Sequence, residues 1–186
     1  MDVKKAIEKR RAYRSLDPVE ITDELIEDLA ESASLAPSCF NNQPWKYVFV
    51  HDKEKLEKVF DSLSSGNEWA TNASMIIGVF SKKEDDCVIK DREYYLFDTG
   101  LATSMLVLRA TELGLVAHPI AGYSPKKAKE VMKIPEEYRL ITLVIVGKHS
   151  DEVKDILSEK QKKDEKRRPA RKDIEEIAYH NEFENF

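Results

Sequence analysis

The chain has 186 residues, of which 41% are hydrophobic and 35% are charged, and its formal net charge is −5 at pH 7. This length favours a single domain over residues 1–186, and the share of apolar residues excludes a compositionally disordered chain. The negative net charge argues against general binding to nucleic acid or to an anionic membrane.

The first predicted element is a short amphipathic helix over residues 2–11. At its end the chain brings Arg10, Arg11 and Arg14 close together. Arginine presents a planar fork of donors that suits phosphate oxygens. The spacing alone is equally consistent with a phosphate site and with a solvated basic turn.

A second helix begins at Thr22, which is a reasonable N-cap, and its apolar stripe predicts a face toward the core. It should end near Ala36, because Pro37 has no N–H to continue the helical hydrogen bonds. The polar loop 38–43 then leads to an apolar run at 47–50, which predicts a strand. A polar loop held between a helix and a buried strand is a common place for a ligand.

The middle of the chain alternates helical and strand patterns. Residues 53–60 predict a surface helix, and residues 75–80 predict a strand that is buried on both faces. After the polar stretch 82–92, the longest helical pattern runs over 94–115, with Gly114 as a plausible C-cap. By composition alone, this long helix is predicted to be a buried core helix.

Residues 118–123 are predicted to form a rigid turn, because they contain Pro119 and Gly122. His118 stands alone, and a packed or solvated histidine is more common than a general acid. A helix capped by Ser124 follows, and then a third buried strand over 140–147. Apolar strands between helices indicate α/β or α+β layers with a covered sheet.

The composition changes near the C-terminus. Residues 151–168 are highly charged, and we interpret them as an exposed arm because acidic residues interrupt the lysines and arginines. An aromatic tail with Tyr179, Phe183 and Phe186 follows, and such a tail should dock on another surface. We therefore expect residues 151–186 to form a C-terminal arm of the single domain.

Cysteine usage and hydropathy bear on compartment and metal content. Cys39 and Cys87 do not make a disulfide framework, and no Cys/His spacing suits zinc. No apolar run approaches the roughly 20 residues of a membrane span, and the N-terminus lacks the apolar core of a signal peptide. We expect a reduced, cytoplasmic protein with no metal site.

Two motifs in this order resemble the FMN-dependent nitroreductase family. The basic cluster stands where that family has its phosphate-binding arginines. The other motif looks like the flavin loop of the family and reads Ala36-Pro37-Ser38, then Asn41, then Gln43-Pro44-Trp45. The resemblance covers nearly the whole chain and is weakest over residues 82–92 and 151–168.

The resemblance implies an α+β fold of three layers, in which helices flank a central mixed, mostly antiparallel sheet. It also implies a homodimer with an exchanged C-terminal arm and two FMN sites shared across the interface, so that Pro37, Ser38 and Asn41 reach the flavin bound mainly by the other subunit. Asn67 matches an asparagine at the flavin ring edge, and a turn-forming role is about as common. The implied contacts of a non-covalent FMN are Arg10, Arg11, Ala12 (through its backbone), Arg14, Pro37, Ser38, Asn41, Asn67, Ala121, Gly122, Arg171 and Lys172.

The resemblance implies an NAD(P)H-dependent FMN oxidoreductase with a ping-pong mechanism. NAD(P)H gives a hydride to the flavin and leaves, and a small conjugated acceptor such as a nitroaromatic or a quinone is then reduced. No side chain need be an acid or a base, and the Glu that some relatives carry where Ala121 stands is absent. The alternatives are another FMN chemistry on this scaffold (dehalogenation, enone reduction or flavin fragmentation) and a flavin-binding protein without turnover.

Overall fold

The computed structural model describes residues 1–183, so Phe186 of the predicted aromatic tail lies outside the described residues. The α-helices are α1 (Val3–Lys9), α2 (Asp23–Ser34), α3 (Lys53–Phe60), α4 (Tyr95–Glu112), α5 (Pro125–Met132) and α6 (Glu159–Lys166). The strands are β1 (Leu16–Asp17), β2 (Lys46–Val50), β3 (Met75–Ser81), β4 (Val88–Ile89), β5 (Arg92–Glu93), β6 (Leu115–Ile120) and β7 (Arg139–His149). Short 3-10 turns are η1 (Cys39–Asn41), η2 (Glu68–Asn72), η3 (Lys83–Asp85) and η4 (Ile174–Glu176).

The main sheet has the order β2–β3–β7–β6, and β1 pairs with the C-terminal end of β7. Every pairing among the described strands is antiparallel, with Ile77 opposite Val144 and Ala117 opposite Val146. A separate hairpin pairs β4 with β5. The structure therefore confirms the α+β class and the mostly antiparallel sheet that the resemblance implied.

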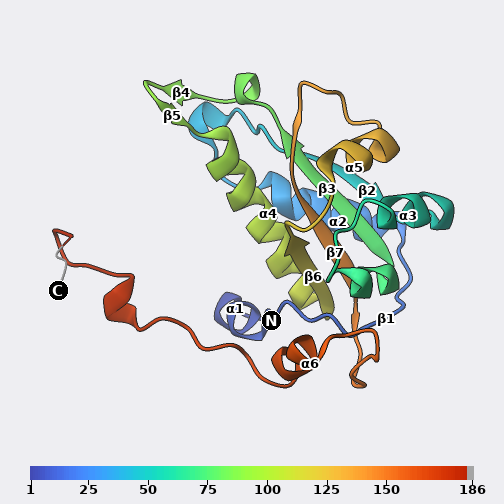
Figure 1. The fold of residues 1–186 in the computed structure, drawn as a ribbon. Coiled ribbons are helices and arrows are strands. Elements are labelled where there is room, and N and C mark those ends of the chain that lie inside the picture. The colour runs from blue at the N-terminus through green and yellow to red at the C-terminus, as the bar shows by residue number, and fades with distance from the viewer. Residues whose placement is uncertain (184–186) are drawn as a thin grey trace.

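Helices cover both faces of this sheet (Figure 1). On one face, the buried side chains of α2 and α4 pack against Ile77 and Val144. On the other face, those of α3 and α5 pack against Ile76 and Ile145. Successive residues of a strand point to opposite faces. Because both faces of β3 are covered by helices, all of its side chains are buried, and its sequence up to Phe80 is a continuous apolar run. The result is the three-layer arrangement.

The local signals at the helix ends also hold. The Thr22 hydroxyl accepts a hydrogen bond from the Leu25 amide at 3.2 Å and so caps α2. Pro125 opens α5 directly after the Ser124 cap. Gly114 follows the C-cap of α4 with a φ of +80°, a conformation that glycine adopts at little cost.

The predicted turn at 118–123 is wrong in its first half, because residues up to Ile120 form strand β6. Pro119 lies exposed in this strand, opposite Val144. Proline cannot donate to a sheet, so it is confined mainly to edge strands, where no neighbour needs its N–H. β6 is such an edge strand, which reconciles Pro119 with a regular pairing.

The prediction that residues 151–168 form an exposed arm is also wrong in part. Helix α6 lies beside the N-terminal segment, and Glu165 within it is buried, with only 6% of its surface exposed. From Pro169 to Phe183 the chain is largely exposed and runs away from the body of the molecule (Figure 1). Within residues 1–183, no helix combines the length and the hydropathy that crossing a membrane would require.

Candidate functional site

The predicted basic cluster forms one wall of an open cavity of about 190 Å³. Helix α1 ends at Lys9, and the chain then leaves the helix in an irregular segment that leads to β1. The cavity is lined by Arg10, Arg11, Ala12, Arg14, Asp164, Arg168, Pro169 and Arg171. The structure thus brings four predicted N-terminal residues together with the predicted C-terminal residue Arg171.

Five arginines line this cavity, and three of them, Arg10, Arg168 and Arg171, are close enough for their charges to repel one another. Burial lowers the pKa of Arg10 from its ordinary value, and the positive charges of Arg168 and Arg171 lower it further. An anion that binds between positively charged groups reduces their mutual repulsion, so its binding is favourable. This corner of the molecule is therefore suited to a doubly charged phosphate group, which arginine can bind through paired hydrogen bonds.

Two of the predicted residues take other roles in this structure. Arg11 donates to the Tyr13 hydroxyl at 3.2 Å and to the carbonyls of Asp164 and Glu165 at 2.9 and 3.1 Å, so its guanidinium is largely engaged by the protein. Lys172 does not line the cavity, and its ammonium lies 3.9 Å from a Glu176 carboxylate oxygen. Arg168 was not predicted, because it belongs to a charged stretch that was interpreted as a solvated arm.

Asn67 and the Ala121–Gly122 turn meet directly. The Asn67 side-chain amide donates to the Gly122 carbonyl at 2.8 Å, and its oxygen accepts from the Trp69 indole N–H at 3.3 Å. A Cβ added at Gly122 would lie 2.3 Å from the Asn67 amide nitrogen, so a larger residue here would displace the Asn67 side chain from its present position. Asn67, which the resemblance assigned to the flavin ring edge, and Gly122, another implied flavin contact, are therefore neighbours.

Trp69 connects this turn to the basic segment. The Arg14 guanidinium lies 6.0 Å from the Trp69 ring centroid, within the usual range of a cation–π contact. The His118 ring also stacks on Trp69, with 4.7 Å between the ring centroids. Trp69 therefore links the arginine-lined cavity to the Asn67–Gly122 contact.

His118 is a packed, neutral histidine. It is 7% exposed, and its Nδ1 lies 3.1 Å from the Tyr13 carbonyl, which can only accept, so Nδ1 carries the proton. Burial lowers the pKa of His118 to about 4, and the nearby Arg14 and Arg10 charges add to the effect. These features favour the packing role expected from the sequence over a general acid that works near neutral pH.

A second, mostly apolar cavity of about 380 Å³ runs along α4. It is lined by Arg10, Val79, Thr99, Gly100, Thr103, Ser104, Val107, Leu108, Pro119, Ile141 and Thr142. Arg10 belongs to the walls of both cavities. The arrangement suits a ligand with an anionic group at one end and a flat apolar group at the other.

The loop that carries Pro37, Ser38 and Asn41 makes different contacts. The Ser38 hydroxyl accepts from the Gln43 amide at 3.0 Å, and the Cys39 amide donates to Asp98 of α4 at 2.7 Å. No hydrogen bond among the described residues joins this loop to the basic segment or to the Ala121–Gly122 turn. One chain alone therefore does not gather all of the predicted flavin contacts.

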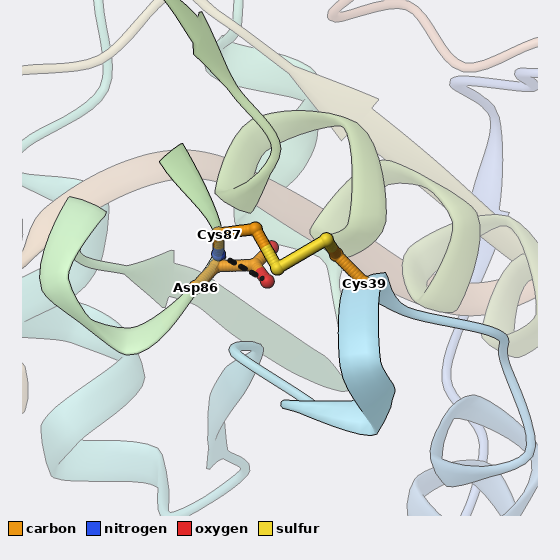
Figure 2. A group of neighbouring side chains, drawn as sticks. All are labelled: Cys39, Asp86 and Cys87. Atoms are coloured by element: carbon orange, nitrogen blue, oxygen red, sulfur yellow. Dashed lines mark hydrogen bonds between the residues drawn. A yellow bond between two sulfur atoms is a disulfide. The ribbon is translucent and has the colours of Figure 1, made fainter. Parts of the chain in front are cut away.

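The expectation that both cysteines are reduced is wrong in this structure. Cys39 of η1 and Cys87, which precedes β4, form a disulfide with their Cα atoms 6.0 Å apart (Figure 2). They are 48 residues apart in the sequence, so spacing gave no sign of the pairing. The Asp86 carboxylate lies beside the sulfurs, but the sulfurs are bonded to each other and offer no thiolate to a metal.

The disulfide restrains a strained loop. Phe40, Asn41 and Gln43 have φ values of 49°, 60° and 50°, a region that costs most residues energy unless their surroundings enforce it. The enforcing contacts are the disulfide and the bond from the Cys39 amide to Asp98. Burial raises the pKa of the Asp98 carboxyl, and Asp86 nearby raises it further, although the Cys39 amide opposes the shift.

We expect the double substitution Cys39→Ser and Cys87→Ser to lower the free energy of unfolding by about 2–4 kcal/mol, because the unfolded chain loses its cross-link. Urea unfolding with and without dithiothreitol measures this. The reductant should destabilise the wild-type protein and leave the double variant unchanged. Equal stability of wild type and variant without reductant would show that the disulfide contributes nothing.

Comparisons with known proteins identify relatives of the chain in sequence and in fold. A sequence model described as the Nitroreductase family matches residues 7–70. A provisional NADH dehydrogenase/NAD(P)H nitroreductase of Archaeoglobus fulgidus is 32% identical over 154 residues, which cover 80% of this chain and 86% of that protein. An iodotyrosine deiodinase of Haliscomenobacter hydrossis is 28% identical, with 76% of each chain covered. The crystal structure of an FMN-containing oxidoreductase superposes with a TM-score of 0.85 at 27% identity, over 100% of this chain and 95% of that one.

Proposed function

This chain belongs to the nitroreductase family, and on that premise we propose that it is an FMN-dependent oxidoreductase that takes electrons from NAD(P)H and reduces a small conjugated acceptor. The observation that carries the proposal is the convergence of Arg10, Arg168 and Arg171 at one cavity, whose Arg14 side chain is linked through Trp69 to the Asn67–Gly122 contact. FMN combines a phosphate with a flat ring, and this pair of features matches that ligand.

The residues present fit the cofactor. Arg10, Arg14, Arg168 and Arg171 would bind the phosphate, and backbone N–H groups of the Ala121–Gly122 turn would face the ring. FMN, when bound, supplies the electron transfer between NAD(P)H and the acceptor. Backbone donors aimed at the ring would stabilise the negative charge that develops on reduction. His118 remains neutral near pH 7, so it adds no positive charge to that of the arginines.

We further propose that the working unit is a homodimer. The cavity along α4 is open and apolar, and residues 169–183 run away from the body of the molecule with Phe183 68% exposed (Figure 1). Exposed apolar surface of this kind indicates that another protein surface packs against the cavity and the C-terminal segment. In a two-fold dimer, each chain would contribute Pro37, Ser38 and Asn41 to the partner's flavin.

The first experiment is the visible absorption spectrum of the purified protein, before and after anaerobic addition of NADH or NADPH. We expect flavin bands that bleach on addition, and extraction should release FMN. Bands that persist would instead identify a flavin-binding protein without NAD(P)H turnover. A protein that shows no bands even after incubation with FMN would contradict the proposal.

A second candidate is reductive dehalogenation, which the similarity to the iodotyrosine deiodinase favours. The two reactions share the cofactor and differ in the acceptor. Anaerobic turnover of the pre-reduced protein with nitrobenzene, a benzoquinone and an iodophenol in parallel would distinguish them. Oxidation of the flavin only by the iodophenol, with iodide release, would support the second candidate over the first.

A further inference from the structure

Glu165 is a buried carboxylate in the otherwise exposed and charged helix α6. It is 6% exposed, and within residues 1–183 the basic side chain nearest to its carboxylate is His149, whose Nε2 lies 3.7 Å away. Burying a carboxylate is costly unless hydrogen bonds satisfy its oxygens. The position therefore needs an explanation beyond solvation of a surface helix.

The carboxylate of Glu165 binds the backbone of the basic segment. The Arg14 amide donates to both of its oxygens, at 3.0 and 3.1 Å, and the Ser15 amide donates to one of them at 3.0 Å. Hydrogen bonds from N–H groups to an ionised acceptor are about twice as strong as neutral ones. Glu165 thus fixes the backbone from which the Arg14 side chain extends toward the cavity.

Two arginine side chains also join the basic segment to the α6 segment through backbone carbonyls. Arg11 donates to the carbonyls of Asp164 and Glu165 at the C-terminal end of α6, where a positive charge is favourable. Arg168 donates to the carbonyls of Glu8 and Arg10, the latter at 2.8 Å. The basic segment and the α6 segment therefore hold each other, and both supply arginines to the same cavity.

We propose that Glu165 is a positioning residue for the phosphate of FMN. It places a negative charge close to an anion site, which by electrostatics alone weakens anion binding. Its benefit is geometric, because it holds Arg14 and its neighbours in one arrangement that meets Arg168 and Arg171. This inference rests on the proposed function, and it assigns a role to the charged segment 151–168.

Electrostatics and positioning predict opposite results for Glu165→Ala. Loss of a negative charge alone should strengthen FMN binding, whereas loss of the backbone contacts should weaken it, by about 10- to 100-fold. Riboflavin lacks the phosphate, so its affinity should change by no more than about threefold. Fluorescence titration of the apoprotein with FMN and with riboflavin gives both dissociation constants.

Two further variants separate positioning from charge and from folding. Glu165→Gln keeps an oxygen that can accept from the Arg14 and Ser15 amides, so most of the FMN affinity should return. Glu159→Gln removes the same charge from an exposed site on α6, where the side chain is 85% exposed, and FMN binding should not weaken. Equal weakening of FMN and riboflavin in Glu165→Ala, or tighter FMN binding, would overturn the proposal.

Hydrogen exchange keeps this test separate from the test of the cofactor. In the apoprotein, the Arg14 and Ser15 amides should exchange slowly, and Glu165→Ala should remove that protection selectively. If the wild-type protein binds neither flavin, the proposed function fails, and protected amides would still show the contact with Glu165. If these amides exchange rapidly in the wild type, Glu165 does not position them and the inference fails.

Discussion

Substitution of Arg10 by alanine should weaken FMN binding by about 10- to 100-fold, because hydrogen bonds to charged groups contribute about 1.5–3 kcal/mol each and each 1.4 kcal/mol is a factor of ten. Arg10 is the best single probe of the cofactor site, since it lines both the basic cavity and the apolar cavity along α4. Equilibrium titration of the apoprotein with FMN measures the effect.

The charge of the variant needs its own control. Lys58→Ala removes one positive charge from an exposed position of α3, where the side chain lines neither cavity, and FMN affinity should stay within about twofold of wild type. The effect of Arg10→Ala should also shrink as salt rises, because salt screens the attraction between Arg10 and the phosphate in the wild-type protein. An unchanged FMN dissociation constant for Arg10→Ala would remove this residue from the site, and with it the argument from the three crowded guanidinium groups.

The sequence predicts the layers of this fold well, because burial on both faces leaves a visible apolar run at β3 and β7. It fails where the stabilising contacts are polar and distant. Glu165 and Arg168 lie in a lysine-rich stretch without an apolar stripe, and their partners near Arg14 are about 150 residues away. No local pattern distinguishes such a segment from a solvated arm.

The remaining differences have similar causes. The bond between Cys39 and Cys87 depends on how η1 meets the segment before β4, and two cysteines 48 residues apart carry no spacing pattern that predicts a pairing. Pro119 argued for a turn, but proline is permitted at a sheet edge. The Asn67–Gly122 contact could be proposed only from the family resemblance, because local sequence says nothing about which turns meet.

His118 should make the protein sensitive to acid. Its pKa is about 4 in the folded protein, whereas an unfolded histidine titrates near 6.5, so the unfolded chain binds more protons between these values. The free energy of unfolding should therefore fall as the pH drops from about 6.5 to 4, by about 3 kcal/mol in all and about 2 kcal/mol between pH 7 and pH 5. Urea unfolding at a series of pH values measures this loss.

Substitution identifies the group responsible. His118→Gln should lower stability at pH 7, because the ring loses its contact with Trp69, yet it should remove about 2 kcal/mol of the difference between pH 7 and pH 5. His180→Gln changes an exposed histidine and should leave the pH dependence as in the wild type. Bound FMN should reduce the acid sensitivity, since a phosphate near Arg10 and Arg14 offsets the charges that help to keep His118 neutral. The same pH slope in His118→Gln as in the wild type would place the titrating group elsewhere.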